Sequence, residues 1–143
     1  MSEFLYNELF AIACGKKLGQ GFARSVYVLS ANDDYVIKVE TRAQSFQNVS
    51  EWETWSWVKE HPALAKWFAP CTDISPSGAF LVKRRVTPLR PRERPKKLPA
   101  FLCDLKIENF GLYKGRVVCC DYGTVHSAIR DVPRKLVEAT WRT

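Results

Sequence analysis

The chain has 143 residues and a mass of 16.4 kDa, with 46% hydrophobic, 13% aromatic and 26% charged residues. This composition is that of one globular domain, and it excludes a disordered tail or a fibrous protein. No apolar run approaches the roughly 18 to 20 residues of a membrane-spanning helix, and the first ten residues lack the basic segment of a secretory signal. We therefore expect a soluble, cytoplasmic protein without a membrane partner.

All of the excess positive charge lies in residues 83–97, where eight bases accompany one acid. Four prolines between residues 88 and 99 predict that this segment is an extended, solvated connector and not a packed helix. We favour an exposed linker, and the alternative is a binding site for phosphate, an acidic protein or nucleic acid. Nucleic acid is the least favoured partner, because no aromatic residue for base stacking lies between Lys83 and Lys97.

Hydrophobic periodicity and turn residues predict the elements in chain order. Three helices are expected: one capped by Ser2 that stops at Gly15, a long buried one over 44–60, and a last one that starts at Asp131 and has Leu136, Val137 and Trp141 as apolar residues. Five strands are expected, over 25–30, 35–40, 79–86, 110–113 and 116–120. Turns are expected at 31–34, 73–78 and 114–115.

A glycine-rich loop precedes the first expected hairpin. Gly19, Gly21 and Val26 follow the pattern G-x-G-x-x-x-x-V. Glycines let a backbone approach phosphate oxygens and offer N–H donors, although such pairs also occur in ordinary hairpins. Lys38 then lies inside an apolar strand, where a buried ammonium would need a carboxylate or a phosphate as partner. The alternative for Lys38 is a side chain that faces solvent.

Polar residues gather in a second pair of motifs. Asp104, Lys106 and Asn109 form D-x-K-x-x-N, and Asp121 begins the sequence D-Y-G after an expected strand. An aspartate beside a hydroxyl can orient it and accept its proton, and a nearby lysine can neutralise a migrating phosphoryl group. Asparagine and a second aspartate supply the oxygen ligands that Mg²⁺ prefers. The alternative is a polar loop between strands.

The glycine loop, the strand lysine, D-x-K-x-x-N and D-Y-G occur in the order found in protein kinases, and residues 16–125 resemble that family in its small phage and bacterial Ser/Thr forms. The resemblance implies ATP and Mg²⁺ as cofactors. The residues that it assigns to the ATP phosphates are Gly19, Gly21, Val26 and Lys38.

The same resemblance assigns the catalytic chemistry. It implies that Asp104 is the base, that Lys106 neutralises the phosphoryl group, and that Asn109 and Asp121 bind Mg²⁺. A glutamate on the helix over 44–60 is expected to pair with Lys38. Glu51 and Glu53 are the two candidates, and we prefer Glu51 because it shares a helical face with apolar residues.

The adenine contact is expected at the end of the strand that leads to the hinge, with Arg84 and Val86 as its residues. Two motifs depart from the family pattern: Arg24 replaces the third loop glycine, and Leu102-Cys103 replaces the His-Arg pair before Asp104. Only 20 residues follow Gly123, which leaves room for a much reduced lower lobe.

The implied fold is α+β: a kinase-like N-lobe over 1–86 with an antiparallel sheet and one long helix, a basic hinge or connector over 87–97, and a minimal C-lobe over 98–143.

The first functional hypothesis is a minimal Ser/Thr protein kinase that transfers the γ-phosphate of ATP to a protein hydroxyl, with small-molecule phosphotransferases as a variant. The second is a catalytically weak or inactive kinase-like interaction protein, such as a phage factor that binds a host protein in the host cytoplasm. The third is a basic nucleic-acid-binding protein. A small lower lobe also suits a homodimer.

Overall fold

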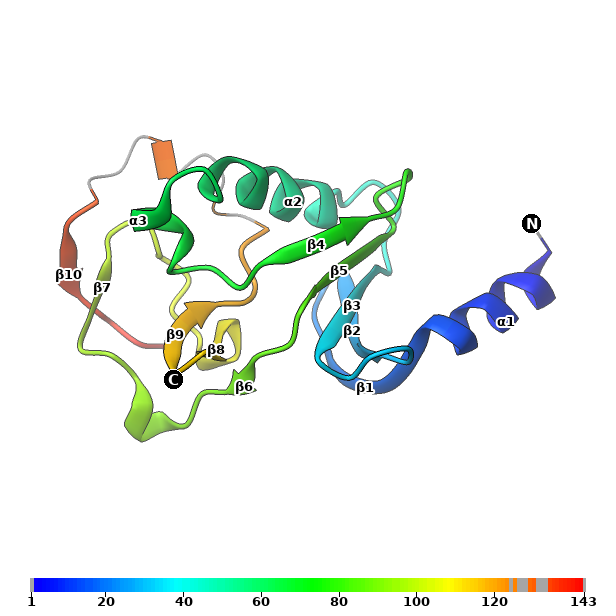
Figure 1. Cartoon of the computed structure of the whole chain (residues 1–143), viewed down its shortest axis with the longest axis horizontal. Helices are drawn as coiled ribbons and strands as arrows, with labels where there is room; N and C mark the ends of the chain where they lie inside the picture. The colour runs from blue at the N-terminus through cyan, green and yellow to red at the C-terminus, as the bar shows by residue number, and fades with distance from the viewer. Residues whose placement is uncertain (1, 124, 126–128, 131–133, 143) are drawn as a thin grey trace. The chain divides into compact units, whose positions relative to one another are not determined.

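The computed structural model describes residues 2–123, 125, 129–130 and 134–142. The chain divides into two compact units (Figure 1). Unit 1 contains Met1–Val49 and Cys71–Arg85, and unit 2 contains Ser50–Pro70 and Val86–Thr143. Among the described residues, no helix has the length and apolar character needed to cross a membrane.

Unit 1 is built on one antiparallel sheet of five strands in the order β1-β2-β3-β5-β4. The strands are β1 (Cys14–Gln20), β2 (Arg24–Leu29), β3 (Tyr35–Glu40), β4 (Cys71–Ile74) and β5 (Phe80–Arg84). The predicted strands at 25–30, 35–40 and 79–86 are confirmed within one or two residues at each end. The sequence did not predict β1, and it placed Asp73 and Ile74 of β4 in a turn.

Both missed strands are held mainly by their neighbours in the sheet. β1 is exposed beyond Cys14, so its sequence lacks the alternation that marks a half-buried strand. In β4, Asp73 pairs with Val82 of β5 although it has a turn-forming side chain. Tertiary pairing therefore overrides local preference at both edges of the sheet.

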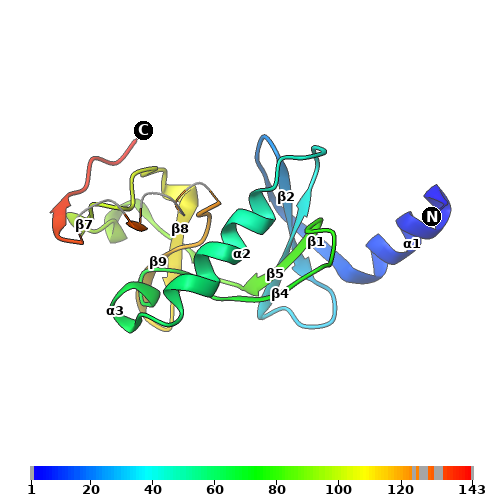
Figure 2. The same cartoon turned by 90° about the horizontal axis from the view of Figure 1, so that it is seen from above.

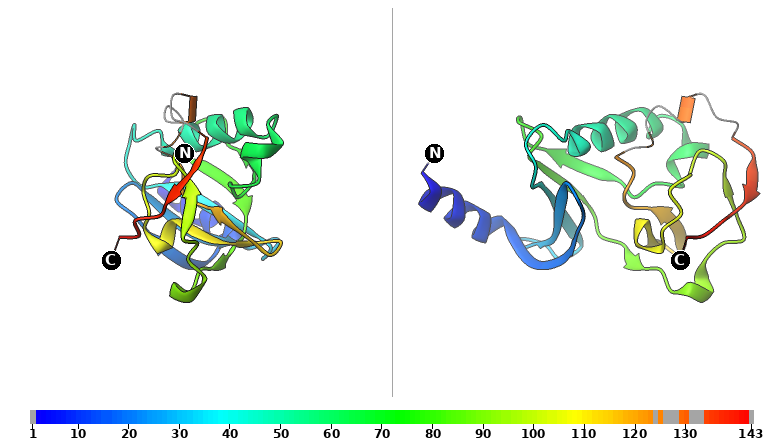
Figure 3. Two further views of the ribbon diagram at one scale, coloured as in Figure 1. Left: turned by 90° about the vertical axis from the view of Figure 1, so that its left-hand side faces the viewer. Right: turned by 180° about the vertical axis from the view of Figure 1, so that it is seen from behind.

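The helix α1 (Glu3–Ala13) confirms the first predicted helix, since the Ser2 hydroxyl accepts a hydrogen bond of 3.2 Å from the Leu5 amide. Phe10 packs edge-on against Tyr27 with ring centroids 5.1 Å apart, beside a core of Cys14, Ile37 and Val39. The rest of α1 extends away from the sheet of unit 1 (Figure 3).

The long predicted helix is confirmed as α2 (Gln47–Val58), which is shorter than expected. It begins after Phe46 because Gln44 and Phe46 have φ angles of 61° and 54°, in the left-handed region. Inside unit 1, the buried Asn48 donates side-chain hydrogen bonds to the carbonyls of Lys38, Gly78 and Ala79. The following short helix is α3 (Pro62–Ala65).

Unit 2 contains two small antiparallel sheets (Figure 2). One has the order β6-β8-β9 and consists of β6 (Thr87–Pro88), β8 (Phe110–Tyr113) and β9 (Arg116–Cys119). The predicted hairpin of β8 and β9 is confirmed, and its turn residues Lys114 and Gly115 have φ angles of 51° and 75°, as a two-residue turn between twisted strands requires.

The second sheet pairs β7 (Lys97–Pro99) with β10 (Leu136–Glu138). The predicted final helix is therefore wrong over 136–138, because these residues adopt an extended conformation opposite β7. Its proposed start at Asp131 lies outside the described residues. The basic connector holds the 3₁₀ turn η1 (Pro91–Glu93), and it is anchored at both ends because Leu89 and Leu98 are buried.

Aromatic packing forms the interior of unit 2. Phe68 stacks with Phe101 at 5.9 Å between ring centroids and meets Tyr122 edge-on at 4.9 Å. The Tyr122 hydroxyl donates a hydrogen bond of 2.6 Å to the Ala69 carbonyl, so this buried phenol is satisfied. The α+β fold predicted from the sequence is confirmed, with an antiparallel sheet of five strands and few helices. The division into an N-lobe over 1–86 and a C-lobe over 98–143 stays a prediction, and residues 50–58 of α2 belong to unit 2.

Candidate functional site

Within unit 2, Asp104, Lys106 and Asn109 lie on one short loop that ends in the 3₁₀ turn η2 (Ile107–Asn109). The buried side chains of Leu102 and Leu105 anchor the loop on both sides of Asp104. Backbone hydrogen bonds of 3.0 Å run from the Lys106 amide to the Asp104 carbonyl and from the Asn109 amide to the Lys106 carbonyl. The apolar anchors and tight turns leave Asp104 and Lys106 partly or fully accessible to solvent.

Asn109 connects this loop to the D-Y-G segment. Its side-chain amide donates a hydrogen bond of 3.0 Å to the Asp104 carbonyl. Its own carbonyl accepts hydrogen bonds from the amides of Cys120 at 2.7 Å and Asp121 at 3.4 Å. The two motifs that the sequence identified separately therefore lie together, and Asn109 makes both connections.

The residues present fit a hard divalent cation. Because the Asn109 side chain donates through its nitrogen, its Oδ1 is left as the atom that can face a cation, and the exposed Asp121 adds a carboxylate. Among the described residues no cluster of three or more His, Cys, Asp or Glu side chains forms a metal cage. Two oxygen ligands suit Mg²⁺, which keeps several waters and is also bound by substrate phosphates.

The Asp104 carboxylate has a basic neighbour that the sequence motifs did not indicate. The guanidinium of Arg142 lies 2.9 Å from Asp104 Oδ1, as both a hydrogen bond and an ion pair. The Arg142 side chain is 61% exposed and the Asp104 side chain is 42% exposed. No local pattern could have found this contact, because the two residues are 38 positions apart.

In unit 1, three of the four residues expected to bind phosphate form one row across the sheet, and Gly21 lies beyond the end of β1. Gly19 of β1 pairs with Val26 of β2, and Val26 pairs with Lys38 of β3. Directly paired residues of an antiparallel sheet project their side chains to the same face, so Val26 and Lys38 share a face. Lys38 is 5% exposed, which agrees with the expectation of a buried lysine.

The glycine loop closes between β1 and β2, where the Gly21 amide donates a hydrogen bond of 2.8 Å to the Arg24 carbonyl. Arg24, which stands where the third glycine is expected, is buried, and its guanidinium donates to the Asn48 side-chain oxygen at 3.1 Å. Arg24 is therefore a structural residue of unit 1.

Glu51 and Glu53 differ sharply in burial. Glu51 is fully buried, whereas Glu53 is exposed. The preceding residue, Ser50, donates a hydrogen bond through its hydroxyl to the Gly123 carbonyl, which ties the second turn of α2 to the D-Y-G segment in unit 2. A buried carboxylate requires a compensating partner, so the burial favours Glu51 over Glu53 as a functional acid. Its pairing with Lys38 stays a prediction.

The expected adenine-binding residues end the strand β5 and begin unit 2. In unit 1 the Arg84 guanidinium lies 4.5 Å from the centre of the Tyr35 ring, in a cation–π contact. In unit 2 Val86 is partly buried against Gly111. Their role toward adenine stays a prediction.

No protein-family model and no curated protein matches the sequence. Among solved structures, the chain is similar to the aminoglycoside phosphotransferase APH(2″)-IIa in its complex with gentamicin, at 18% identity and a TM-score of 0.47. It is also similar to that protein in its ternary complex with streptomycin and ATP, at 18% identity and a TM-score of 0.45. Each match covers 63% of this chain and 30% of the other. Both TM-scores are below 0.5, so the similarity assigns no function to this chain.

Proposed function

We propose that the chain is a minimal, kinase-like phosphotransferase that uses ATP and Mg²⁺. The observation that carries the proposal is the connection through Asn109, which holds the loop of Asp104 beside the loop of Asp121 within one compact unit. A carboxylate for the attacking hydroxyl and oxygen ligands for a cation are the two requirements of phosphoryl transfer that a protein must supply in fixed positions.

In the proposed reaction the hydroxyl oxygen of the substrate attacks the γ-phosphorus of ATP, and the bond from the γ-phosphorus to the β-phosphate oxygen breaks. The hydroxyl proton passes to the Asp104 carboxylate, and ADP leaves. Lys106 would neutralise charge on the phosphoryl group. Mg²⁺ held by Asn109 and Asp121 would neutralise the phosphates of ATP.

Unit 1 would supply nucleotide binding. The exposed Gly19 and Gly21 would let the backbone approach the phosphates. Gly19 lies in the same cross-strand row as Val26 and Lys38. We propose Glu51 as the carboxylate that fixes Lys38, and the backbone from Arg84 to Val86 as the adenine contact. The preferred substrate is a Ser or Thr hydroxyl of a protein, and a hydroxyl of a small molecule is the variant.

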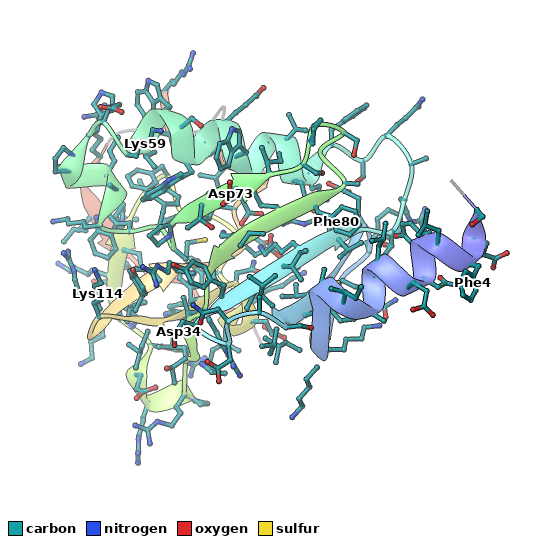
Figure 4. The ribbon with its side chains drawn as sticks, turned by 45° about the vertical axis from the view of Figure 1, so that its right-hand side comes forward. Phe4, Asp34, Lys59, Asp73, Phe80 and Lys114 are labelled. Atoms are coloured by element: carbon teal, nitrogen blue, oxygen red, sulfur yellow. The ribbon has the colours of Figure 1, made fainter. Side chains whose placement is uncertain are left out.

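The test is incubation of the purified protein with γ-labelled ATP and Mg²⁺, alone and with a bacterial lysate. Label on the protein itself or on lysate proteins should disappear in Lys38→Ala and Asp121→Ala and persist in Lys59→Ala, which removes an exposed lysine after α2 (Figure 4). Transfer that survives without Mg²⁺, or in Asp121→Ala, would contradict the proposal.

A second candidate function, a kinase-like interaction protein, is favoured by one observation. The helix α1 exposes several large apolar side chains, including Phe4 at 75%, which Figure 4 labels, and Ile12 at 70%. An exposed apolar stripe of this kind is typical of a protein contact, here with a host protein or a second copy of the chain. Partner binding that is unchanged in an Asp104→Asn, Asp121→Asn double variant, together with no phosphoryl transfer by the unaltered chain, would establish this function instead.

A further inference from the structure

Residues 134–142, called here the strap, run antiparallel to the chain that leads into the Asp104 loop. β10 pairs with β7 so that Leu136 lies opposite Pro99 and Glu138 opposite Lys97. The Ala100 amide donates to the Lys135 carbonyl at 3.1 Å, and the Ala139 amide donates to the Lys96 carbonyl at 2.8 Å. The pairing therefore continues beyond both ends of the two short strands.

The end of the strap is fixed by an aromatic anchor. The indole nitrogen of Trp141 donates a hydrogen bond of 2.9 Å to the Pro95 carbonyl, and its ring meets Phe110 edge-on at 5.0 Å between centroids. The next amide, that of Arg142, donates to the Leu105 carbonyl at 2.8 Å. The backbone of Arg142 is thus held on the residue that follows Asp104.

This backbone contact places the Arg142 guanidinium 2.9 Å from Asp104 Oδ1. An ion pair between exposed side chains contributes little to the free energy of unfolding, because solvent screens it and the side chains lose conformational freedom. The value of this pair lies in its geometry. Both backbones are fixed by hydrogen bonds, so the pair restricts the rotation of the Asp104 carboxylate.

We propose that Arg142 is the positioning residue that orients Asp104 for phosphoryl transfer, an inference that rests on the proposed function. A carboxylate accepts several hydrogen bonds through its two oxygens. Arg142 takes Oδ1 and leaves Oδ2 for the attacking hydroxyl. The strap thereby completes a site whose other polar residues come from the loops around Asn109 and Asp121.

The experiment compares the rate of label transfer from ATP in the unaltered protein, Arg142→Ala, Arg142→Lys and the control Arg92→Ala. Arg92 is exposed and lies in the 3₁₀ turn η1 of the connector, so its removal subtracts one positive charge from unit 2. We expect kcat to fall about ten-fold or more in Arg142→Ala with KM for ATP changed less than about two-fold, because orientation and not nucleotide binding is lost. Arg142→Lys should recover part of kcat, and Arg92→Ala should match the unaltered protein.

The melting temperature separates this role from a structural one, since an exposed ion pair leaves it nearly unchanged in Arg142→Ala. An unchanged kcat in Arg142→Ala would overturn the inference alone. A raised kcat would also overturn it, because the contact would then be inhibitory. An unaltered protein that transfers no label would overturn the proposed function itself, before any variant is compared.

Discussion

Asn109 fixes Asp104 through a hydrogen bond of 3.0 Å from its side-chain amide to the Asp104 backbone carbonyl. Because the backbone carbonyl accepts this hydrogen bond, the Asp104 carboxylate remains available for other contacts. Asn109 makes a second connection through its backbone carbonyl, which accepts hydrogen bonds from the amides of Cys120 and Asp121. One residue therefore determines the spacing between the proposed base and the proposed metal ligand.

Replacement of Asn109 with Ala should lower both stability and activity. The Asn109 side chain is buried, and its loss removes one of the two donors to the Asp104 carbonyl, since the Lys106 amide remains, at a cost of about 0.5–1.5 kcal/mol in the free energy of unfolding. Urea unfolding measures this cost, and Asn7→Ala, an exposed position on α1, is the matched control. Equal midpoints for the Asn109 and Asn7 variants would show that the hydrogen bond contributes nothing.

Asn48→Ala should be among the most destabilising substitutions in unit 1. The fully buried side chain donates to three carbonyls and accepts from Arg24 at 3.1 Å, so its loss leaves several buried groups without partners. We expect a loss of about 3 kcal/mol or more, measured by urea unfolding, since each unsatisfied buried group costs about 1–3 kcal/mol. Asn32→Ala, which removes one exposed turn contact to the Asp34 amide, is the control and should lose far less.

Two glycine substitutions should separate folding from nucleotide binding. A Cβ on Gly111 would lie 2.4 Å from Val86 Cγ2 and 2.8 Å from the Thr87 carbonyl oxygen, so Gly111→Ala should cost about 1–3 kcal/mol through backbone displacement. A Cβ on Gly19 meets nothing within 4 Å. Gly19→Ala should therefore keep the melting temperature while it weakens ATP binding, measured by titration calorimetry.

The reverse pattern would count against the glycine loop. If Gly19→Ala bound ATP as tightly as the unaltered protein, the backbone near Gly19 would not approach the phosphates. If Gly111→Ala melted normally, the packing of β8 against Val86 would be looser than the structure shows.

The five cysteines should react with iodoacetamide in an order set by burial. Desolvation raises the pKa of the Cys14 thiol above its ordinary value of 9.0, so at pH 8 it holds less thiolate than a solvated cysteine. Cys103 is exposed and should be alkylated first, and Cys14 should be among the last. Mass spectrometry of the labelled peptides gives the order, and Cys103→Ser should remove the fastest phase.

The same pKa shift has a consequence for stability. Because the folded state holds the Cys14 proton more tightly, the unfolded chain loses its proton first as the pH rises past 9.0, and the stability contributed by the protonated thiol is lost above that pH. Cys14→Ala should weaken this alkaline dependence in urea unfolding. Early alkylation of Cys14 at pH 8 would contradict the burial of this residue, which is the first of β1.

Local chemistry made part of this structure predictable. Ser2 caps α1, and Lys114 with Gly115 forms the hairpin turn, because each signal lies within a few residues of the element that it determines. The D-x-K-x-x-N spacing likewise indicated the Asp104 loop, because a short loop places its polar residues close together.

Long-range pairing was not predictable by the same means. Leu136 and Val137 have an apolar pattern that suits a helix, and only the opposite strand, with Leu98, makes them extended. The contact of Arg142 with Asp104 depends in turn on that pairing. Residues whose function depends on a partner 38 positions away carry no signal of it in the sequence around them.

The strap also determines the stage of synthesis or refolding at which the proposed site is complete. Trp141 and Arg142 contact residues 46 and 38 positions earlier, so on a growing chain the Asp104 loop is made well before its partners leave the ribosome. The local hairpin of β8 and β9 closes first, since its loop is short. In refolding, the indole signal of Trp141 should therefore change after the hairpin forms. The proposed site would therefore be completed after the local hairpin, when Trp141 and Arg142 reach their partners.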